Sequence, residues 1–250
     1  MNEYQNMNHE NQKNIIVTGA SSGIGAATSR ALAAQGHRVF LGARREDSLR
    51  TLVADIQRDG GQAEYRRLDV TDHADFKNFV KAAEERFGPV DVLVNNAGVM
   101  PLSPVHDLRI EEWNSMIDVN LRGVLHGVAS ALPGMRSRRA GHIINVASVA
   151  GLRVDPTAAI YCATKYAVRA FSEGLRQENT DVRVTVVSPG FTLTELTDRG
   201  GNPEVRAAAH AAAEQFGIPA TAAADVIAFA VAQPANVDIN ELVVRPTLQQ

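Results

Sequence analysis

Tyr161 and Lys165 stand four positions apart in a helical pattern. Residues at i and i+4 project from the same face of a helix, so the ammonium lies within reach of the phenol. A free phenol has a pKa of about 10, too high for an efficient acid/base at neutral pH, and a nearby cation lowers that pKa. The pair therefore predicts a proton-handling group. The alternative is a half-buried helix tyrosine beside a surface lysine.

Two polar residues in apolar surroundings extend this candidate site. Ser148 follows the apolar run His142 to Val146, and ligands of open parallel sheets bind beyond the carboxyl ends of the strands. Its hydroxyl can hold a substrate oxygen while charge develops there. Asn120 stands between Val119 and Leu121, where a buried amide is unfavourable unless it is hydrogen-bonded. A structural capping role is the alternative for this residue.

A glycine-rich segment near the N-terminus has the character of a phosphate-binding loop. Residues 18–25 read Thr-Gly-Ala-Ser-Ser-Gly-Ile-Gly and join an apolar run to a helical pattern. Glycines let the backbone approach a pyrophosphate, and the helix N-terminus offers free N–H groups. The spacing Gly-x-x-x-Gly-x-Gly differs from the commoner G-x-G-x-x-G, and a simple turn is the alternative. The expected cofactor-binding residues are Gly19, Ser21, Ser22, Gly23, Ile24 and Gly25, with Gly25 also serving strand–helix packing.

Two arginines, Arg44 and Arg45, follow the second apolar run. Dinucleotide-binding folds place an acidic residue there when the cofactor carries a free 2′-hydroxyl. Guanidinium groups instead form charge-assisted hydrogen bonds with a 2′-phosphate, so the pair predicts NADP(H). Arg44 is the better candidate because it lies nearer the strand. Alternatively, both arginines are solvated at a helix start and pair with Glu46 or Asp47.

These residues stand on an alternation of short apolar runs with longer helical patterns. We expect strands at 14–18, 38–41, 63–68, 90–94, 142–146, 182–187 and 239–244, and helices at 23–35, 46–58, 72–87, 110–135, 159–177, 203–216 and 221–232. The alternation predicts a doubly wound α/β fold of Rossmann type, a parallel sheet with helices on both faces. Without a low-complexity linker, residues 14–250 are expected to form a single domain after a disordered polar tail at 1–13.

The composition excludes several classes of protein. The chain has 250 residues, of which 45% are hydrophobic and 21% charged, as in soluble globular proteins. A net charge of −3 predicts no general attraction to nucleic acid or to anionic membrane. No apolar run reaches the roughly 18 residues of a membrane span. One cysteine, Cys162, allows no internal disulfide, which fits a cytoplasmic protein, and the seven histidines show no metal-ligand spacing.

The ordered set of motifs resembles the short-chain dehydrogenase/reductase family over about residues 15–244. The matching residues are the loop 18–25, Asn95-Asn96-Ala97-Gly98, Asn120, Ser148, Tyr161-x-x-x-Lys165 and Pro189-Gly190. Within the family, the chain is most similar to NADPH-dependent carbonyl reductases (ketoreductases). The resemblance implies a sheet of about seven strands and a homotetramer, or a homodimer, formed through the two long helices.

The resemblance also implies a role for each matching residue. Tyr161 would be the general acid/base, with Lys165 lowering its pKa and binding the nicotinamide ribose, Ser148 holding the substrate oxygen and Asn120 holding a water in a proton relay. The remaining cofactor contacts would be Asp69 and Val70 at the adenine, Asn96, Ala97 and Gly98 at the ribose, and Pro189, Gly190, Thr192 and Thr194 at the nicotinamide. Asn95 would instead brace the central strand.

Apolar residues flank these motifs and predict a pocket for a ketone or aldehyde, with alcohol oxidation as the reverse reaction. The expected lining is Val99, Ala150, Leu152, Phe191 and Leu193, with Arg153 as a nearby charge for acidic substrates. Residues 191–218 contain Gly200-Gly201 and are expected to form a mobile lid, or else an ordinary surface loop and helix. The alternative function is a non-catalytic NADP-sensing or scaffold protein. Such proteins tend to lose the Tyr or the Lys, and this chain keeps both.

Overall fold

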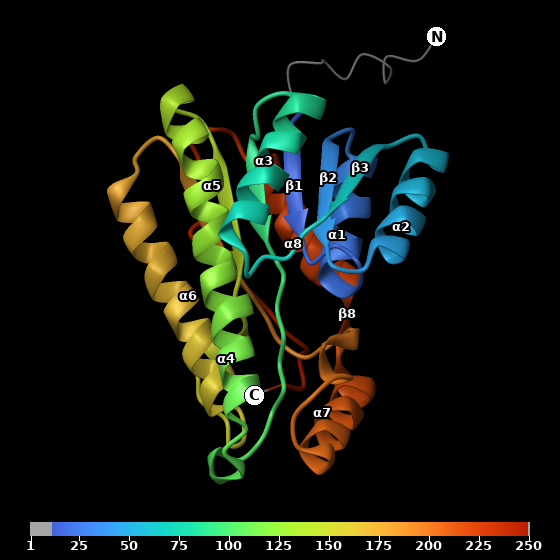
Figure 1. Cartoon of the computed structure of the whole chain (residues 1–250), viewed down its shortest axis with the longest axis vertical. Coiled ribbons are helices and arrows are strands. Elements are labelled where there is room, and N and C mark those ends of the chain that lie inside the picture. Colours follow the sequence, from blue (N-terminus) through green and yellow to red (C-terminus); the bar gives the residue numbers. More distant parts are fainter. Residues whose placement is uncertain (1–11, 250) are drawn as a thin grey trace.

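A seven-stranded parallel sheet forms the centre of the computed structural model, which describes residues 12–249 (Figure 1). The spatial order is β3-β2-β1-β4-β5-β6-β9. These strands are β1 (Asn14–Thr18), β2 (Arg38–Ala43), β3 (Gln62–Arg67), β4 (Val92–Asn95), β5 (His142–Val146), β6 (Arg183–Pro189) and β9 (Glu241–Val244). The expected doubly wound α/β fold is confirmed. Because the order reverses between β1 and β4, a ligand crevice opens beyond their carboxyl ends.

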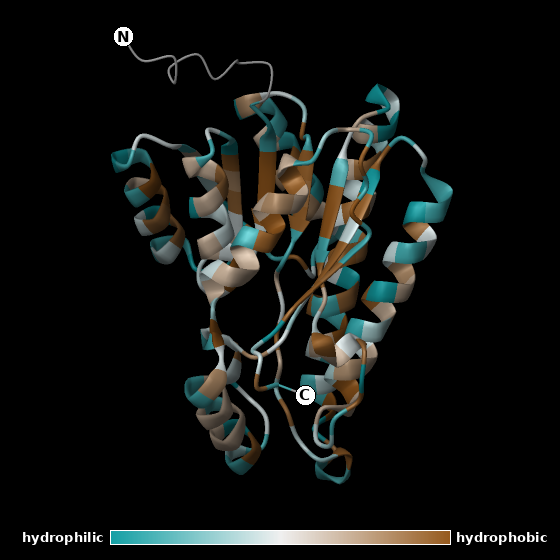
Figure 2. Ribbon diagram, turned by 180° about the vertical axis from the view of Figure 1, so that it is seen from behind, coloured by the Kyte–Doolittle hydropathy of each residue, from teal (hydrophilic) through white to brown (hydrophobic). Residues whose placement is uncertain are grey.

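Helices cover both faces of the sheet. One layer consists of α1 (Gly23–Ala34), α2 (Glu46–Arg58) and α8 (Ala220–Ala232), and the other of α3 (His73–Phe87), α5 (Gly123–Arg138) and α6 (Ala159–Glu178). Successive residues of β1 show the reason: Val17 packs in the core with Leu32, whereas Ile16 packs in the opposite core with Phe76. Strands buried on both faces therefore read as continuous apolar runs. Figure 2 shows them as the hydrophobic centre between helices with polar outer faces.

The long helix expected at 110–135 is interrupted. Helix α4 (Ile110–Ile117) passes into a π-helical turn at Asp118–Arg122 before α5 continues the same direction. Asn120 lies in this turn, and its amide accepts a hydrogen bond from Val99 N–H at 2.8 Å and donates one to Val99 carbonyl at 2.9 Å. The wider turn thus brings a polar side chain against the loop after β4. Such turns inside helices often mark functional sites.

Residues 191–218 contain a small second sheet that the sequence did not indicate. β7 (Thr192–Leu193) pairs in parallel with β8 (Ile218–Pro219), so the segment expected to form a lid, which we call the lid segment or lid below, leaves and rejoins the body at one place. Between them lie a 3-10 turn (Glu195–Thr197) and α7 (Pro203–Phe216). Figure 1 shows α7 beyond the carboxyl ends of the strands, apart from both helical layers.

Residues 1–11 of the tail expected at 1–13 lie outside the described residues. Gln12 and Lys13, which the sequence placed in that tail, belong to the fold: their side chains donate hydrogen bonds to the carbonyls of Gly36 and Val231. Within residues 12–249, no helix combines the length and the apolar character needed to cross a membrane. The same residues contain no group of three or more His, Cys, Asp or Glu that could hold a metal ion.

Candidate active site

A cavity of about 900 Å³ extends along the carboxyl ends of the strands, from the glycine loop to the lid. This volume lies within the range of roughly 300–1,000 Å³ that is usual for ligand pockets. Most of the residues predicted from the sequence lie in its wall: Gly19, Ser21, Ser22, Gly23, Ile24, Arg44, Arg45, Asp69, Val70, Asn96, Ala97, Gly98, Val99, Ser148, Ala150, Arg153, Tyr161, Lys165, Pro189, Gly190, Phe191, Thr192 and Thr194.

Four predicted site residues lie elsewhere. Leu152 and Leu193 are 40% and 46% exposed and lie outside the cavity wall, so the structure does not bring them together with the other expected pocket residues. Gly25 lies behind the wall, where a Cβ would meet the Gly19 carbonyl oxygen at 2.5 Å. Its role is therefore the close packing of helix on loop. Asn120 is fully buried behind the cavity.

The glycine loop forms a cradle at the N-terminus of α1. Gly19 and Gly23 have φ of +65° and +53°, a region that favours glycine. A Cβ on Gly19 would lie 2.7 Å from Ala97 Cα. Ser22, at the N-cap of α1, makes no side-chain capping hydrogen bond with the N–H groups of the first turn. These features fit the pyrophosphate of a dinucleotide.

Two neighbouring asparagines support this cradle. Asn96 Nδ2 donates to Thr18 carbonyl at 2.9 Å, and Asn96 N–H donates to Thr18 Oγ1 at 3.0 Å. The amide expected at the cofactor ribose is therefore engaged with the glycine loop, although Asn96 also lines the cavity. Asn95 Nδ2 donates to Asn145 Oδ1 at 2.9 Å and joins β4 to β5, the bracing role expected for it.

The two arginines after β2 are in different situations. Arg45 donates to Ser21 Oγ at 3.2 Å, to Ser22 Oγ at 2.7 Å and to Glu195 Oε2 at 2.7 Å. Among residues 12–249, Arg44 makes no hydrogen bond or ion pair, and it is exposed at the cavity wall. Neither arginine pairs with Glu46 or Asp47 in this part of the chain, which disfavours the alternative of helix-start ion pairs.

The candidate acid/base lies at the other end of the cavity. Tyr161 and Ser148 are joined by a side-chain hydrogen bond. Ser148 Oγ is held in turn by the Ala150 N–H, which donates to it at 3.1 Å. Lys165 Nζ lies 5.7 Å from the centroid of the Tyr161 ring and donates to the Val146 carbonyl at 2.9 Å. The sequence-predicted trio is thus brought together at the carboxyl end of β5.

Burial controls the protonation of this trio. Desolvation raises the pKa of Tyr161 to about 12, although the hydrogen bond with Ser148 lowers it. Desolvation also lowers the pKa of Lys165 to about 8. Lys165 is not among the causes of this shift, so the expected lowering of the Tyr161 pKa by Lys165 stays a prediction. The ammonium lies over the ring and bonds to a backbone carbonyl, and the side chains are only 6% and 5% exposed. Tyr161 consequently keeps its proton at neutral pH.

Asn120 is held by several hydrogen bonds. Besides its pair of bonds with Val99, its Nδ2 donates to Thr164 Oγ1 at 3.2 Å. A Cβ on Gly98 would lie 3.5 Å from Asn120 Oδ1 and 3.9 Å from Lys165 Nζ, so both side chains border the same glycine. These bonds tie the π-helical turn to the loop after β4 and to α6 rather than capping a helix end, and a part in a proton relay stays a prediction.

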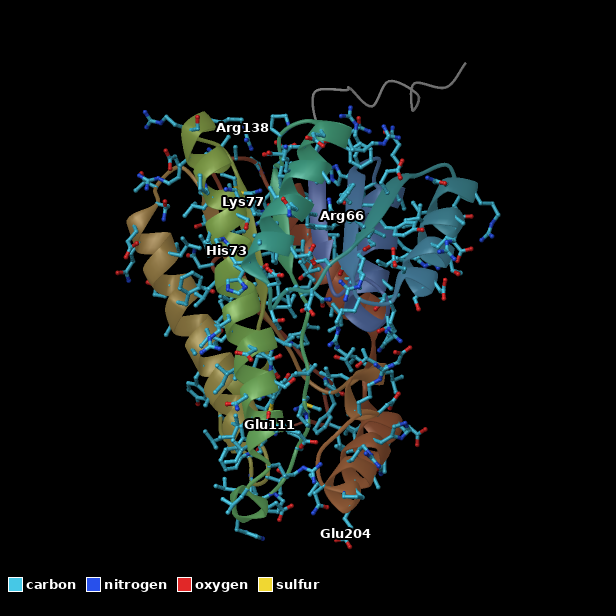
Figure 3. All side chains as sticks on the ribbon, viewed as in Figure 1. Arg66, His73, Lys77, Glu111, Arg138 and Glu204 are labelled. Atoms are coloured by element: carbon cyan, nitrogen blue, oxygen red, sulfur yellow. The ribbon has the colours of Figure 1, made fainter. Side chains whose placement is uncertain are left out.

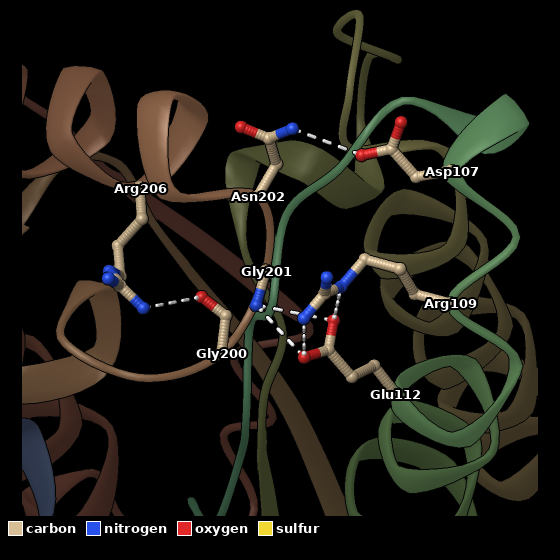
Figure 4. A network of polar contacts seen from close by, with 7 residues as sticks. All are labelled: Asp107, Arg109, Glu112, Gly200, Gly201, Asn202 and Arg206. Carbon is tan, nitrogen blue, oxygen red and sulfur yellow. Dashed lines mark hydrogen bonds and ion pairs between the residues drawn. The ribbon is translucent and has the colours of Figure 1, made fainter.

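The segment expected to form a lid is hydrogen-bonded to the first turn of α4 and to the residues just before that helix (Figure 4). Glu112 accepts hydrogen bonds from Gly201 N–H at 3.1 and 3.2 Å, and Arg109 donates to the same carboxylate at 2.6 and 2.7 Å. The Asn202 N–H donates to Leu102 carbonyl at 2.8 Å. Gly201 has φ +74°, and a Cβ there would lie 2.4 Å from the Leu102 oxygen. The glycine is therefore needed at this junction.

Several wall residues escaped sequence reasoning. Glu195 and Arg199 come from the lid, together with small side chains of α7 (Ala208, Ala209 and Ala212). Gln249 comes from beyond β9, and its Oε1 accepts a hydrogen bond from Phe191 N–H at 2.9 Å. No spacing pattern marks these residues, because they reach the cavity only through the folding of distant segments. Arg199 stands directly before Gly200-Gly201, and this position was the one sign in the sequence that it could reach the cavity.

Comparisons with known proteins agree with this geometry. A family model described as short chain dehydrogenase matches residues 13–204. An uncharacterized oxidoreductase of Listeria monocytogenes is 43% identical over 241 residues, which cover 95% of this chain and 97% of that protein. An alcohol dehydrogenase of the archaeon Thermococcus sibiricus, complexed with 5-hydroxy-NADP, superposes with a TM-score of 0.86 at 32% identity, covering 96% of this chain and 98% of that chain. A short chain dehydrogenase/reductase of Burkholderia phymatum in complex with NAD also has a TM-score of 0.86, at 29% identity, covering 93% and 88%.

Proposed function

The chain belongs to the short-chain dehydrogenase family of oxidoreductases, and from that premise we propose that it reduces a ketone or aldehyde with NADPH, reversibly. One observation carries the proposal. The hydrogen-bonded pair of Tyr161 and Ser148 lies in the wall of a cavity whose other end is an uncapped helix N-terminus framed by glycines. A proton donor and a dinucleotide cradle thus share one space.

The chain's own residues handle the proton. The bound cofactor supplies the hydride, and the carbonyl oxygen then carries the developing negative charge. Ser148 hydrogen-bonds that oxygen, and Tyr161 donates its proton to it. A phenol that is protonated at neutral pH is suited to the acid role in reduction. Lys165 restores a proton to the site, and Asn120 holds the water that links Lys165 to solvent.

The choice of NADP(H) is supported by charge at the adenosine end of the cavity. The Arg45 guanidinium donates hydrogen bonds to Ser21 and Ser22, and Arg44 lies in the same cavity wall. Arg44 interacts with the Asp69 carboxylate only through space and makes no hydrogen bond or ion pair among residues 12–249, so its guanidinium can bind a 2′-phosphate. Since the similar structures include both an NADP-derivative complex and an NAD complex, the arginines carry this part of the proposal.

The end of the cavity beside Tyr161 is lined by apolar side chains and by two arginines, Arg153 and Arg199. Met100, Leu102 and the small side chains of α7 provide the apolar surface. Arg153 pairs with Asp155 at 3.4 Å, whereas Arg199 makes no ion pair within residues 12–249. We infer that carbonyl compounds with an apolar body are accepted and that an acidic group is favoured beside Arg199. Arg199→Ala would then lower kcat/KM for a carboxylated ketone and leave kcat/KM for the neutral analogue of that ketone unchanged. An equal fall in kcat/KM for both ketones would contradict the inference.

Oxidation of NADPH in the presence of varied ketones, aldehydes and oxo acids tests the proposal, with NADH in a parallel series. We expect carbonyl-dependent turnover that is faster with NADPH. Tight binding of NADPH without turnover on any carbonyl would favour a non-catalytic NADP-sensing protein. Faster turnover with NADH would contradict the assignment of Arg44 and Arg45.

A further inference from the structure

The adenosine end of the cavity contains an anion that belongs to the protein itself. Glu195 Oε2 lies 2.7 Å from Arg45 Nη1. The other nitrogens of this guanidinium donate to Ser22 Oγ at 2.7 Å and to Ser21 Oγ at 3.2 Å. All three edges of Arg45 are therefore engaged within the chain, and all four residues line the cavity.

Glu195 is positioned by the contact of the preceding residue, Thr194, with the glycine loop. Thr194 lies against the glycine loop: a Cβ on Gly23 would be 3.0 Å from Thr194 Cγ2. The next residue, Glu195, is thereby held within reach of Arg45, the N-cap residue of α2. Its side chain is 49% exposed and that of Arg45 is 36% exposed, so water reaches the ion pair. An exposed pair of this kind is weak and is readily exchanged for another anion.

We propose that Glu195 competes with the 2′-phosphate of NADP(H) for Arg45, and so sets the affinity and selectivity for the phosphorylated cofactor. The proposal rests on the NADP(H) function proposed above. A carboxylate and a phosphate dianion repel each other when both lie at one guanidinium edge. Arg45 can bind the phosphate only after Glu195 has turned toward solvent. Arg44 makes no hydrogen bond or ion pair within residues 12–249 and interacts with Asp69 only through space, so it binds the phosphate without such a displacement.

Binding of two nucleotide fragments tests this competition. Adenosine 2′,5′-bisphosphate carries the 2′-phosphate, and adenosine 5′-monophosphate lacks it. Calorimetry at low salt would compare the wild type, Glu195→Gln and the matched control Glu204→Gln. The control removes the same charge from the first turn of α7, where Glu204 points away from the body of the protein (Figure 3).

In Glu195→Gln we expect adenosine 2′,5′-bisphosphate to bind about two- to fivefold more tightly, with no change for the monophosphate. Glu204→Gln should match the wild type with both fragments. Unchanged or weaker binding of the bisphosphate by Glu195→Gln would overturn the proposal, and so would an equal gain for both fragments. The wild type reports separately on the proposed function, which fails if the bisphosphate binds no more tightly than the monophosphate.

Discussion

Replacing Lys165 by methionine should change how stability depends on pH. Desolvation lowers the pKa of Lys165 from 10.5 to about 8, so the folded state holds its charge at a free-energy penalty of about 3 kcal/mol near neutral pH. Methionine has a similar length and no charge. It also leaves the Val146 carbonyl without the 2.9 Å hydrogen bond, a loss of about 1–3 kcal/mol. At neutral pH the variant should therefore be as stable as the wild type or more stable, despite losing activity.

The sign of the pH dependence follows from proton binding. Because the folded pKa lies below the unfolded one, the unfolded state binds more protons between those values, and wild-type stability rises with pH in that window. From about pH 7 to about pH 9.5, the wild type should gain about 2 kcal/mol relative to Lys165→Met. Tyr161 acts in the opposite direction, because burial raises its pKa from 10.0 to about 12 and stability then falls above the unfolded value. Measurements below that value therefore isolate Lys165.

Urea unfolding at several pH values and one fixed protein concentration would measure this difference. Lys77→Met, which removes an exposed lysine from α3, serves as the matched control and should show a nearly constant difference from the wild type. A constant difference between the wild type and Lys165→Met over the same range would refute the burial argument. A wild type that loses stability relative to that variant as pH rises would refute its sign.

Three further substitutions test separate parts of the site. Arg44→Ala should raise KM for NADPH about tenfold or more and leave KM for NADH unchanged; a parallel rise in both would mean that Arg44 does not read the phosphate. Asn120→Ala leaves the N–H and the carbonyl of Val99 without their side-chain partner, so the free energy of unfolding in urea should fall by about 2–4 kcal/mol. A fall of less than about 0.5 kcal/mol would show that water replaces the amide. Gly201→Ala would place a Cβ 2.4 Å from the Leu102 oxygen at a left-handed φ, which should loosen the contact between the lid and the α4 region. KM for the carbonyl substrate should then rise while the melting temperature changes little. An unchanged KM would mean that this contact does not affect substrate binding.

The sheet and its helices were predictable because burial on both faces leaves a strong pattern. Helix α2 and strand β5 begin and end at the predicted residues, since a helical apolar period followed by Gly60-Gly61 marks the helix and a short apolar run marks the strand. The π-turn around Asn120 was not predictable from spacing. In this turn, Asn120 is hydrogen-bonded to Val99, which lies in a loop 21 positions earlier in the sequence. Local spacing does not reveal such a contact. Likewise, β7 and β8 are two residues each, too short for any periodicity.

The candidate site was predictable where its chemistry is local in the sequence. Tyr161 and Lys165 share a helix face, and the glycine loop is continuous, so spacing sufficed to place them. The direction of the Tyr161 pKa shift was not predictable, because it depends on how completely the fold excludes water from that helix face. Glu195 was missed for a related reason. Its partner Arg45 is 150 positions away, and the lid alone brings the two together.

Ketone-dependent oxidation of NADPH by Tyr161→Phe tests the central claim most directly, namely that the Tyr161 hydroxyl donates the proton. Tyr166→Phe is the control, since Tyr166 is on the same helix, 39% exposed and outside the cavity wall. We expect kcat of Tyr161→Phe to fall by about 10²–10⁴, while the Kd for NADPH stays within about twofold of the wild type and Tyr166→Phe keeps normal turnover. Wild-type turnover in Tyr161→Phe, with NADPH bound as tightly as before, would contradict the account.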